Sequence, residues 1–212
     1  GVARGGIIIE TGRLEEGIEA MEKSAGGADL PAIPGSWRVW FLAVKAEALI
    51  ELGRVEEAAQ VCEIADERAA EFDNSMSASQ ARRARASLLL ARGEAEAAVE
   101  MAREAVALAG GVGAVLEAGD DRLVLADALR EAGKEDEAVE VLEVALADFV
   151  RCGASLRQKR AEKRLRAMGR KIHRRSAGAT GETGVESLTG REREVAELVV
   201  DRRTNREIAE TL

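Results

Sequence analysis

The sequence is short of the residues from which disulfide frameworks, metal sites and base-stacking surfaces are built. It has two cysteines, one histidine, two tryptophans, three phenylalanines and no tyrosine among 212 residues. Cys62 and Cys152 lie far apart and form no CxxC pair, so we expect neither a disulfide framework nor a zinc site. These features favour a reducing cytoplasm, and the scarcity of aromatic rings argues against a surface that binds single-stranded nucleic acid.

Long apolar runs and catalytic motifs are missing as well. No stretch approaches the run of about 18 uncharged apolar residues that a membrane span requires. The glycine-rich segments 110–113 and 178–181 lack the lysine with which a phosphate-binding loop reaches its nucleotide. His173 lies among basic residues and has no plausible nucleophile beside it. We therefore expect no membrane association, no enzymatic activity and no cofactor in this chain.

Charge is divided unevenly along the chain, whose overall net charge is −8. Residues 1–150 carry 15 basic and 30 acidic side chains, a net of −15, whereas residues 151–212 carry 16 basic and 9 acidic side chains, a net of +7. This asymmetry fits an acidic body joined to a basic segment that binds a polyanion. It fits a solvated charged helix equally well.

The most informative feature that is present is an internal repeat of about 40 residues. The turn glycines Gly12, Gly53, Gly93 and Gly133 are spaced 41, 40 and 40 residues apart, and acidic residues follow each of them. An apolar residue lies four positions before each glycine, and an alanine lies seven before and twelve after each of the last three: Ile8, Leu49, Leu89 and Leu129; Ala46, Ala86 and Ala126; Ala65, Ala105 and Ala145. The first repeat departs from this pattern, with Gly5, Gly17 and Ser24 at the small positions.

Each element of the repeat has a physical meaning. Glycine ends a helix in the left-handed conformation, and acidic residues suit the first turn of the next helix. Small residues let the two helices of a hairpin approach closely while leucine and isoleucine fill the space between them. Helical periodicity supports this interpretation, and no segment alternates with a period of two. The pattern predicts an all-α solenoid of helical hairpins.

The repeat resembles the tetratricopeptide repeat, which has small residues and a turn glycine at these spacings. That repeat is 34 residues long, and we expect the additional residues in loops between hairpins, at 73–77 and 110–113. Solenoids of this kind present a curved surface to a peptide, a partner domain or a small ligand. Trp37 and Trp40 open the second repeat, where they either line a ligand site or pack in the core.

A basic segment follows the repeats. Residues 151–175 contain 11 lysine or arginine side chains and one acid, Glu162. A stripe of Leu156, Ala161, Leu165 and Met168 predicts one final helix that ends near Gly169. The cluster contacts DNA phosphates, docks on the acidic repeats to hold the protein inactive, or is simply a solvated face.

The C-terminal segment contains two sequence signatures of a helix start. Thr189 with Glu192, and Thr204 with Glu207, fit the S/T-x-x-E capping box. Apolar residues at helical spacing follow each box, which predicts two short helices that pack around a tight turn.

This segment, Leu188-Thr-Gly-Arg-Glu-Arg-Glu-Val195 together with Thr204-Asn-Arg-Glu-Ile-Ala209, resembles the opening of the LuxR-type helix-turn-helix. The resemblance implies that Thr204, Asn205 and Arg206 lie near the DNA backbone, at a helix N-terminus. Arg202 replaces the usual turn glycine. The recognition helix that reads bases of double-stranded DNA would follow Leu212, so we interpret the motif as truncated.

We therefore predict three regions: repeats with a basic capping helix at 1–168, a flexible linker at 169–187, and the first part of a helix-turn-helix at 188–212. The resemblance to large LuxR-type regulators implies a transcription regulator whose repeats sense a protein or small ligand and which dimerises on DNA. An interaction scaffold without DNA binding is the alternative. Because the chain begins at Gly1 without an initiator methionine, we expect it to be part of a longer protein.

Overall fold

The glycine turns end helices, as the repeat predicts. The computed structural model describes residues 1–170, and in it the four repeat glycines adopt φ angles between 74° and 85°. The backbone N–H of the residue after each glycine donates to the carbonyl of the apolar residue four positions before that glycine, as from Arg54 to Leu49 at 2.9 Å. These bonds satisfy carbonyls that the helix end would otherwise leave without a donor.

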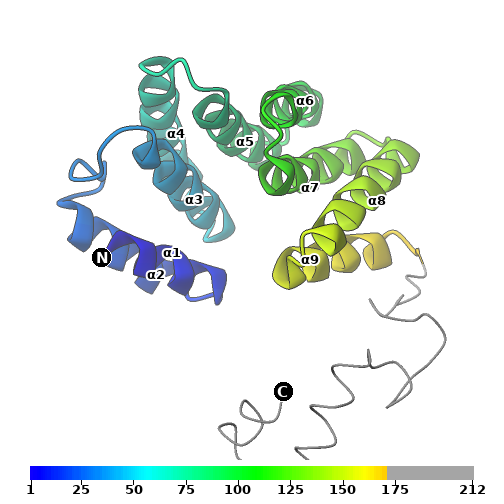
Figure 1. Cartoon of the computed structure of the whole chain (residues 1–212), viewed down its shortest axis with the longest axis horizontal. Coiled ribbons are helices and arrows are strands. Elements are labelled where there is room, and N and C mark those ends of the chain that lie inside the picture. Colours follow the sequence, from blue (N-terminus) through cyan, green and yellow to red (C-terminus); the bar gives the residue numbers. More distant parts are fainter. Residues whose placement is uncertain (171–212) are drawn as a thin grey trace, which may run out of the picture. The chain divides into compact units, whose positions relative to one another are not determined.

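The described residues form helices joined by turns, without strands. The helices are α1 (Val2–Glu10), α2 (Leu14–Ala25), α3 (Trp37–Glu51), α4 (Val55–Ala70), α5 (Ser75–Ala91), α6 (Ala95–Gly111), α7 (Val115–Glu131), α8 (Glu135–Arg151) and α9 (Ser155–Ala167). They pair as four antiparallel hairpins, α1 with α2 through α7 with α8, and α9 follows as the first helix of a further unit (Figure 1).

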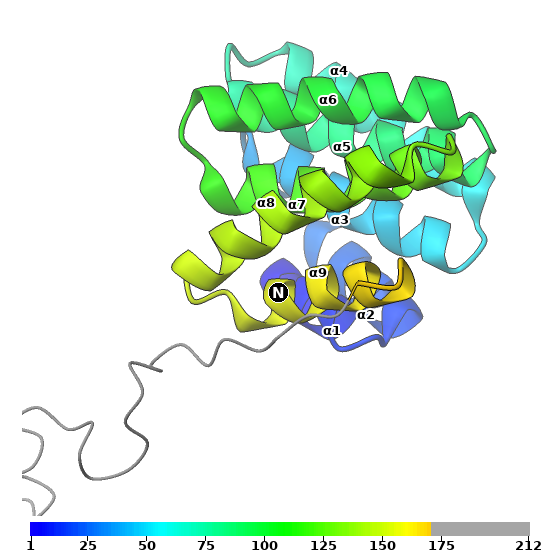
Figure 2. The same cartoon turned by 90° about the vertical axis from the view of Figure 1, so that its right-hand side faces the viewer.

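Successive hairpins stack on one another. Helix α3 packs against α5, α5 against α7, and α8 against α9, so each unit contacts its neighbour in the chain. Two perpendicular views place α4 and α6 on the side of the repeats away from α1 and α9 (Figure 1 and Figure 2). The predicted α-solenoid of helical hairpins is confirmed. The predicted partial helix-turn-helix at 188–212 lies outside the described residues, as does the predicted linker beyond Arg170.

In the second and third repeats the additional residues lie in the helices, so the predicted long loops at 73–77 and 110–113 are wrong. Residues 75–77 begin α5, and residues 110–111 end α6, leaving turns of 71–74 and 112–114. Gly113 and Gly153 adopt φ angles of 70° and 68°, close to those of the repeat glycines. The turns between these hairpins are therefore as tight as the turns within them.

The basic helix α9 ends as predicted, with Gly169 at a φ angle of 74°. Ala161 and Leu165 are buried against α8, but Leu156 is 62% exposed. The apolar stripe is thus shorter than the sequence suggests.

One connection between hairpins is long. Residues 26–36 join α2 to α3, and Leu30 is fully buried there although its φ angle is 54°. The buried Lys45 holds this segment in place: its ammonium group lies 2.6 Å from Glu22 Oε1 and donates to the carbonyl of Ala28 at 2.8 Å. A paired and hydrogen-bonded charge of this kind tolerates burial.

The small positions of the repeat bring the helices of each hairpin into contact. The alanines seven before and twelve after the last three glycines are all fully buried: Ala46, Ala86 and Ala126; Ala65, Ala105 and Ala145. The first hairpin has glycines instead. A Cβ atom at Gly5 would lie 2.7 Å from the carbonyl oxygen of Gly17 and would overlap the side chain of Met21. The first hairpin therefore has glycines in place of these alanines because α1 and α2 approach each other more closely.

We predict that Gly5→Ala lowers the free energy of unfolding by about 1–3 kcal/mol, because the methyl group has no space between α1 and α2. Gly110→Ala is the matched control. A Cβ at Gly110 meets nothing within 4 Å, so alanine should raise stability by about 0.5 kcal/mol through helix propensity. Urea unfolding followed by circular dichroism measures both, and equal effects of the two substitutions would contradict the close approach.

Candidate functional site

The first helices of the hairpins line a groove, which we call the inner groove. It consists of two adjoining cavities of about 680 and 400 Å³ that share Glu47, Glu51, Val124 and Arg164. Helices α3, α5, α7 and α9 line the larger cavity, and Glu10 of α1 joins the lining of the smaller one. The two cavities have the size of sites that hold ligands or short peptide segments.

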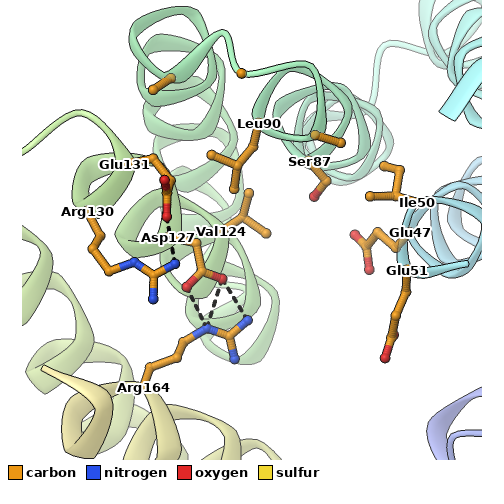
Figure 3. A pocket seen from close by; sticks show the side chains of 13 residues that line it. Glu47, Ile50, Glu51, Ser87, Leu90, Val124, Asp127, Arg130, Glu131 and Arg164 are labelled. Atoms are coloured by element: carbon orange, nitrogen blue, oxygen red, sulfur yellow. Dashed lines mark hydrogen bonds and ion pairs between the residues drawn. The ribbon is translucent and has the colours of Figure 1, made fainter. Parts of the chain in front are cut away.

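Equivalent positions of successive repeats build the larger cavity. Its lining includes the residues six, three and two positions before the turn glycines of the second, third and fourth repeats: Glu47, Ile50 and Glu51; Ser87, Leu90 and Ala91; Asp127, Arg130 and Glu131. Because the repeats stack in register, these side chains come together although they lie about 40 residues apart in sequence. Figure 3 shows the α3 residues and the α7 residues on opposite sides of this cavity.

The groove carries charges of opposite sign. Its acidic wall includes Glu10 of α1 and Glu51 of α3, and its basic wall includes Arg160 and Lys163 of α9. All four side chains are exposed, and none has an ion-pair or hydrogen-bond partner among the described residues. These groups are therefore available to a bound partner.

The other arginines of the basic wall are already paired with α7. Arg157 Nε lies 2.8 Å from Asp120 Oδ2, and Arg164 Nη2 lies 2.8 Å from Asp127 Oδ2. The two pairs are seven residues apart on both helices, so they join the same faces of α7 and α9. Part of the basic segment is thus attached to the acidic repeats. That this contact holds the protein inactive stays a prediction.

A buried ion pair underlies the groove. Arg83 of α5 lines the smaller cavity and donates to Glu47 of α3 at 2.8 Å and to Asp121 of α7 at 3.3 Å. Asp121 also accepts a hydrogen bond from the Ser79 hydroxyl at 2.7 Å. Arg83 is 5% exposed and Asp121 is inaccessible to solvent, so this network links three hairpins through groups that are costly to bury singly.

Burial affects the two partners differently. Burial disfavours the charge of Arg83, but the carboxylates of Glu47 and Asp121 outweigh it and raise the pKa of the guanidinium. Burial raises the pKa of Asp121 to about 6, and Arg83 and Ser79 offset this only in part. The difference follows from the neighbours, because Arg83 lies between carboxylates whereas Asp121 has a single cation.

The sequence-predicted DNA-contacting residues, Thr204, Asn205 and Arg206, lie outside the described residues. The two tryptophans have different surroundings. Trp40 packs partly against the hydrophobic core, whereas Trp37 is 66% exposed, so core packing accounts for Trp40 alone.

Within residues 1–170, no group of three or more histidine, cysteine, aspartate or glutamate side chains is placed to hold a metal ion. Burial raises the pKa of Cys62 to about 12, which keeps this thiol protonated and poorly nucleophilic. None of the described helices is both long and apolar enough to cross a membrane.

A family comparison agrees with the fold. A model described as tetratricopeptide repeat matches residues 39–63, 79–104 and 122–143, which correspond to the hairpins from α3 to α8. The repeats are tetratricopeptide-like. No match to a LuxR-type or helix-turn-helix family was found, and no curated protein and no solved structure matches the chain.

The groove residues were not predicted from the sequence, although the repeat contains a signal for them. The small and apolar positions of the repeat marked the core, whereas the groove lies at the intervening positions. The buried Arg83 and Asp121 gave no such signal, because neither has a charged equivalent at the same offset in the other repeats.

We predict that Asp121 makes stability fall as pH rises from about 4 to 6. The folded protein keeps the Asp121 proton up to pH about 6, whereas the unfolded chain loses it near 4, so the folded state binds more protons within this window. Compared with Asp121→Asn, the wild type should therefore lose on the order of 2–3 kcal/mol between these limits.

Urea unfolding at a series of pH values tests this difference. Asp136→Asn is the control, since Asp136 is exposed in the first turn of α8 and has no ion-pair partner among the described residues. Parallel stability profiles for the wild type and Asp121→Asn would show that Asp121 does not titrate in this window.

Proposed function

We propose that the repeats bind a segment of a protein partner in the inner groove, and that this binding controls DNA binding by residues 188–212. The carrying observation is that the groove presents unpaired charges on its two walls, Glu10 and Glu51 opposite Arg160 and Lys163. Tetratricopeptide-like repeats support a role in protein interaction.

The charges of the groove define the chemistry of its partner. Acidic side chains of the partner would pair with Arg160 and Lys163, and basic ones with Glu10 and Glu51. The apolar residues Val44, Leu123 and Val124 line the same cavity as these charges. Apolar side chains together with charged groups are the usual composition of a protein interface.

Support for the DNA-binding part comes from the sequence alone. The two capping boxes and the resemblance to the LuxR-type helix-turn-helix point to DNA, and residues 151–212 carry a net charge of +7. Thr204, Asn205 and Arg206 are the residues proposed to face phosphate. An interaction scaffold without DNA binding remains the alternative, and the DNA-binding experiment below separates the two.

We predict that peptides selected on the 212-residue chain from a random phage-displayed library are enriched in acidic residues. Their affinity should fall tenfold or more for the double variant Arg160→Glu/Lys163→Glu, because the basic wall then repels them. Fluorescence anisotropy of the labelled peptides measures the affinity.

Lys159→Glu is the matched control for this experiment. Lys159 lies beside Arg160 on α9 and is exposed, but it lies outside the inner groove. Selected peptides whose affinity falls equally in Lys159→Glu would respond to net charge and not to the groove. Peptides that are unaffected by the double variant would refute the groove as the binding site.

We predict that, in a chain extended through the recognition helix expected after Leu212, Arg206→Glu weakens binding to a duplex of about 20 base pairs fivefold or more at low salt. Loss of one phosphate contact should also reduce the slope of log affinity against log salt concentration by about 0.9. Lys134→Glu, in the turn before α8, changes net charge equally and should have little effect. Absence of duplex binding by the extended wild-type chain would instead favour the scaffold.

A further inference from the structure

A further cavity lies beside the inner groove, at the N-terminal ends of α3, α5 and α7. Its volume is about 260 Å³, and we call it the tryptophan pocket. Its lining consists of Ser36, Trp37, Trp40, Asn74, Met76, Ser77, Gln80 and Glu117. Trp37, Ser77 and Glu117 each lie sixteen residues before the turn glycine of their repeat. The stacking of three repeats therefore brings an aromatic ring, a hydroxyl and a carboxylate to one place.

The aromatic rings are fixed with respect to one another. Trp37 and Trp40 are perpendicular, at 85°, with centroids 6.2 Å apart, and Trp40 also meets Phe41 edge-on at 4.6 Å. Trp40 thus packs on Phe41, which is buried in the core, whereas Trp37 is 66% exposed. Trp37 therefore offers an exposed indole ring at the cavity.

Ser77 and Glu117 of the lining have no partner among the described residues. The Ser77 hydroxyl is buried and makes no hydrogen bond with any described residue. Glu117 is the one charged residue that lines the pocket, and its half-buried carboxylate has no ion-pair partner within the described part of the chain. Two indole rings with a single unpaired carboxylate form a site that favours a cation.

We propose that the tryptophan pocket binds an arginine side chain of the peptide that occupies the inner groove. The guanidinium is planar and cationic, so it stacks on an indole face while it donates two hydrogen bonds to a carboxylate such as that of Glu117. Trp40 lines both the tryptophan pocket and the smaller cavity of the groove, so a peptide in the groove lies next to the pocket. That the arginine belongs to a peptide in the groove rests on the proposed function, whereas binding of a cation in the pocket does not.

Intrinsic fluorescence tests the pocket directly, because the chain has two tryptophans, both in the pocket, and no tyrosine. The probe is N-acetyl-arginine methylamide, and the comparison compound is the citrulline analogue, which has nearly the same shape without the charge. We expect a saturable change in the emission of the 212-residue chain with the arginine compound. The citrulline compound should bind at least fivefold more weakly.

Two variants complete the test. Glu117→Gln should reduce the affinity for the arginine compound to that for citrulline, whereas Glu96→Gln, in the equivalent first turn of α6, should leave it unchanged. Thermal unfolding followed by circular dichroism verifies that both variants are folded. Equal affinity for the two compounds, or full affinity of Glu117→Gln, would overturn a cation site.

The groove variant separates this inference from the proposed function. Arg160→Glu/Lys163→Glu should leave binding of the arginine compound intact, because neither residue lines the tryptophan pocket. Peptides that were selected on the groove and contain arginine should lose fivefold or more in affinity when that arginine is replaced by citrulline. Unchanged affinity would show that the pocket does not bind an arginine of the peptide. If the chain binds the arginine compound but no peptide can be selected on it, the proposed function of the groove is refuted and the cation site in the pocket is not.

Discussion

The left-handed glycine turns are the constraint on which the rest of the structure depends. From Gly93 to Gly153 a turn glycine recurs every 20 residues with a φ angle between 68° and 80°. At each turn the following residue donates its N–H to the carbonyl four residues before the glycine. The connections within and between these hairpins are therefore alike, and the helices keep one register. Residues at equal distance from their glycines consequently reach equivalent places along the stack.

This register separates packing from binding along the sequence. The positions seven and four before each turn glycine are nearly uniform in the last three repeats, because they fill the space between helices: Ala46, Ala86 and Ala126; Leu49, Leu89 and Leu129. The positions six and sixteen before the glycine face the groove or the tryptophan pocket and differ in every repeat, as in Trp37, Ser77 and Glu117. Packing requires the same residue in each unit, whereas a binding surface gains its specificity from different ones.

The same distinction explains what sequence reasoning could predict. Uniform positions repeat, so the glycine turns, the buried alanines and the hairpin solenoid were all accessible from the pattern. The groove could not be predicted from the pattern, because its residues lie at the same distance from the turn glycines but differ in chemical type. The lengths of the helices were also missed, because residues 75–77 and 110–111 have loop-forming compositions. The side chain of Asn74 caps α5 by accepting the Met76 N–H at 2.9 Å, and Ser77 is buried, whereas Gly110 and Gly111 continue α6 while exposed. Burial of Arg83 depends on carboxylates from two other hairpins, and no local pattern contains that information.

Helix α9 takes part in both halves of the proposed function, partner binding in the groove and DNA binding. One of its faces is attached to α7 through the pairs Arg157 with Asp120 and Arg164 with Asp127, and the same helix supplies the unpaired Arg160 and Lys163 to the groove. It is also the last described helix before the basic residues and the motif at 188–212. A partner that neutralises the two unpaired charges would change the electrostatic potential of the element that precedes this motif. The charge that attracts a groove ligand is thus the same charge that would assist phosphate binding, so partner and DNA would compete for it.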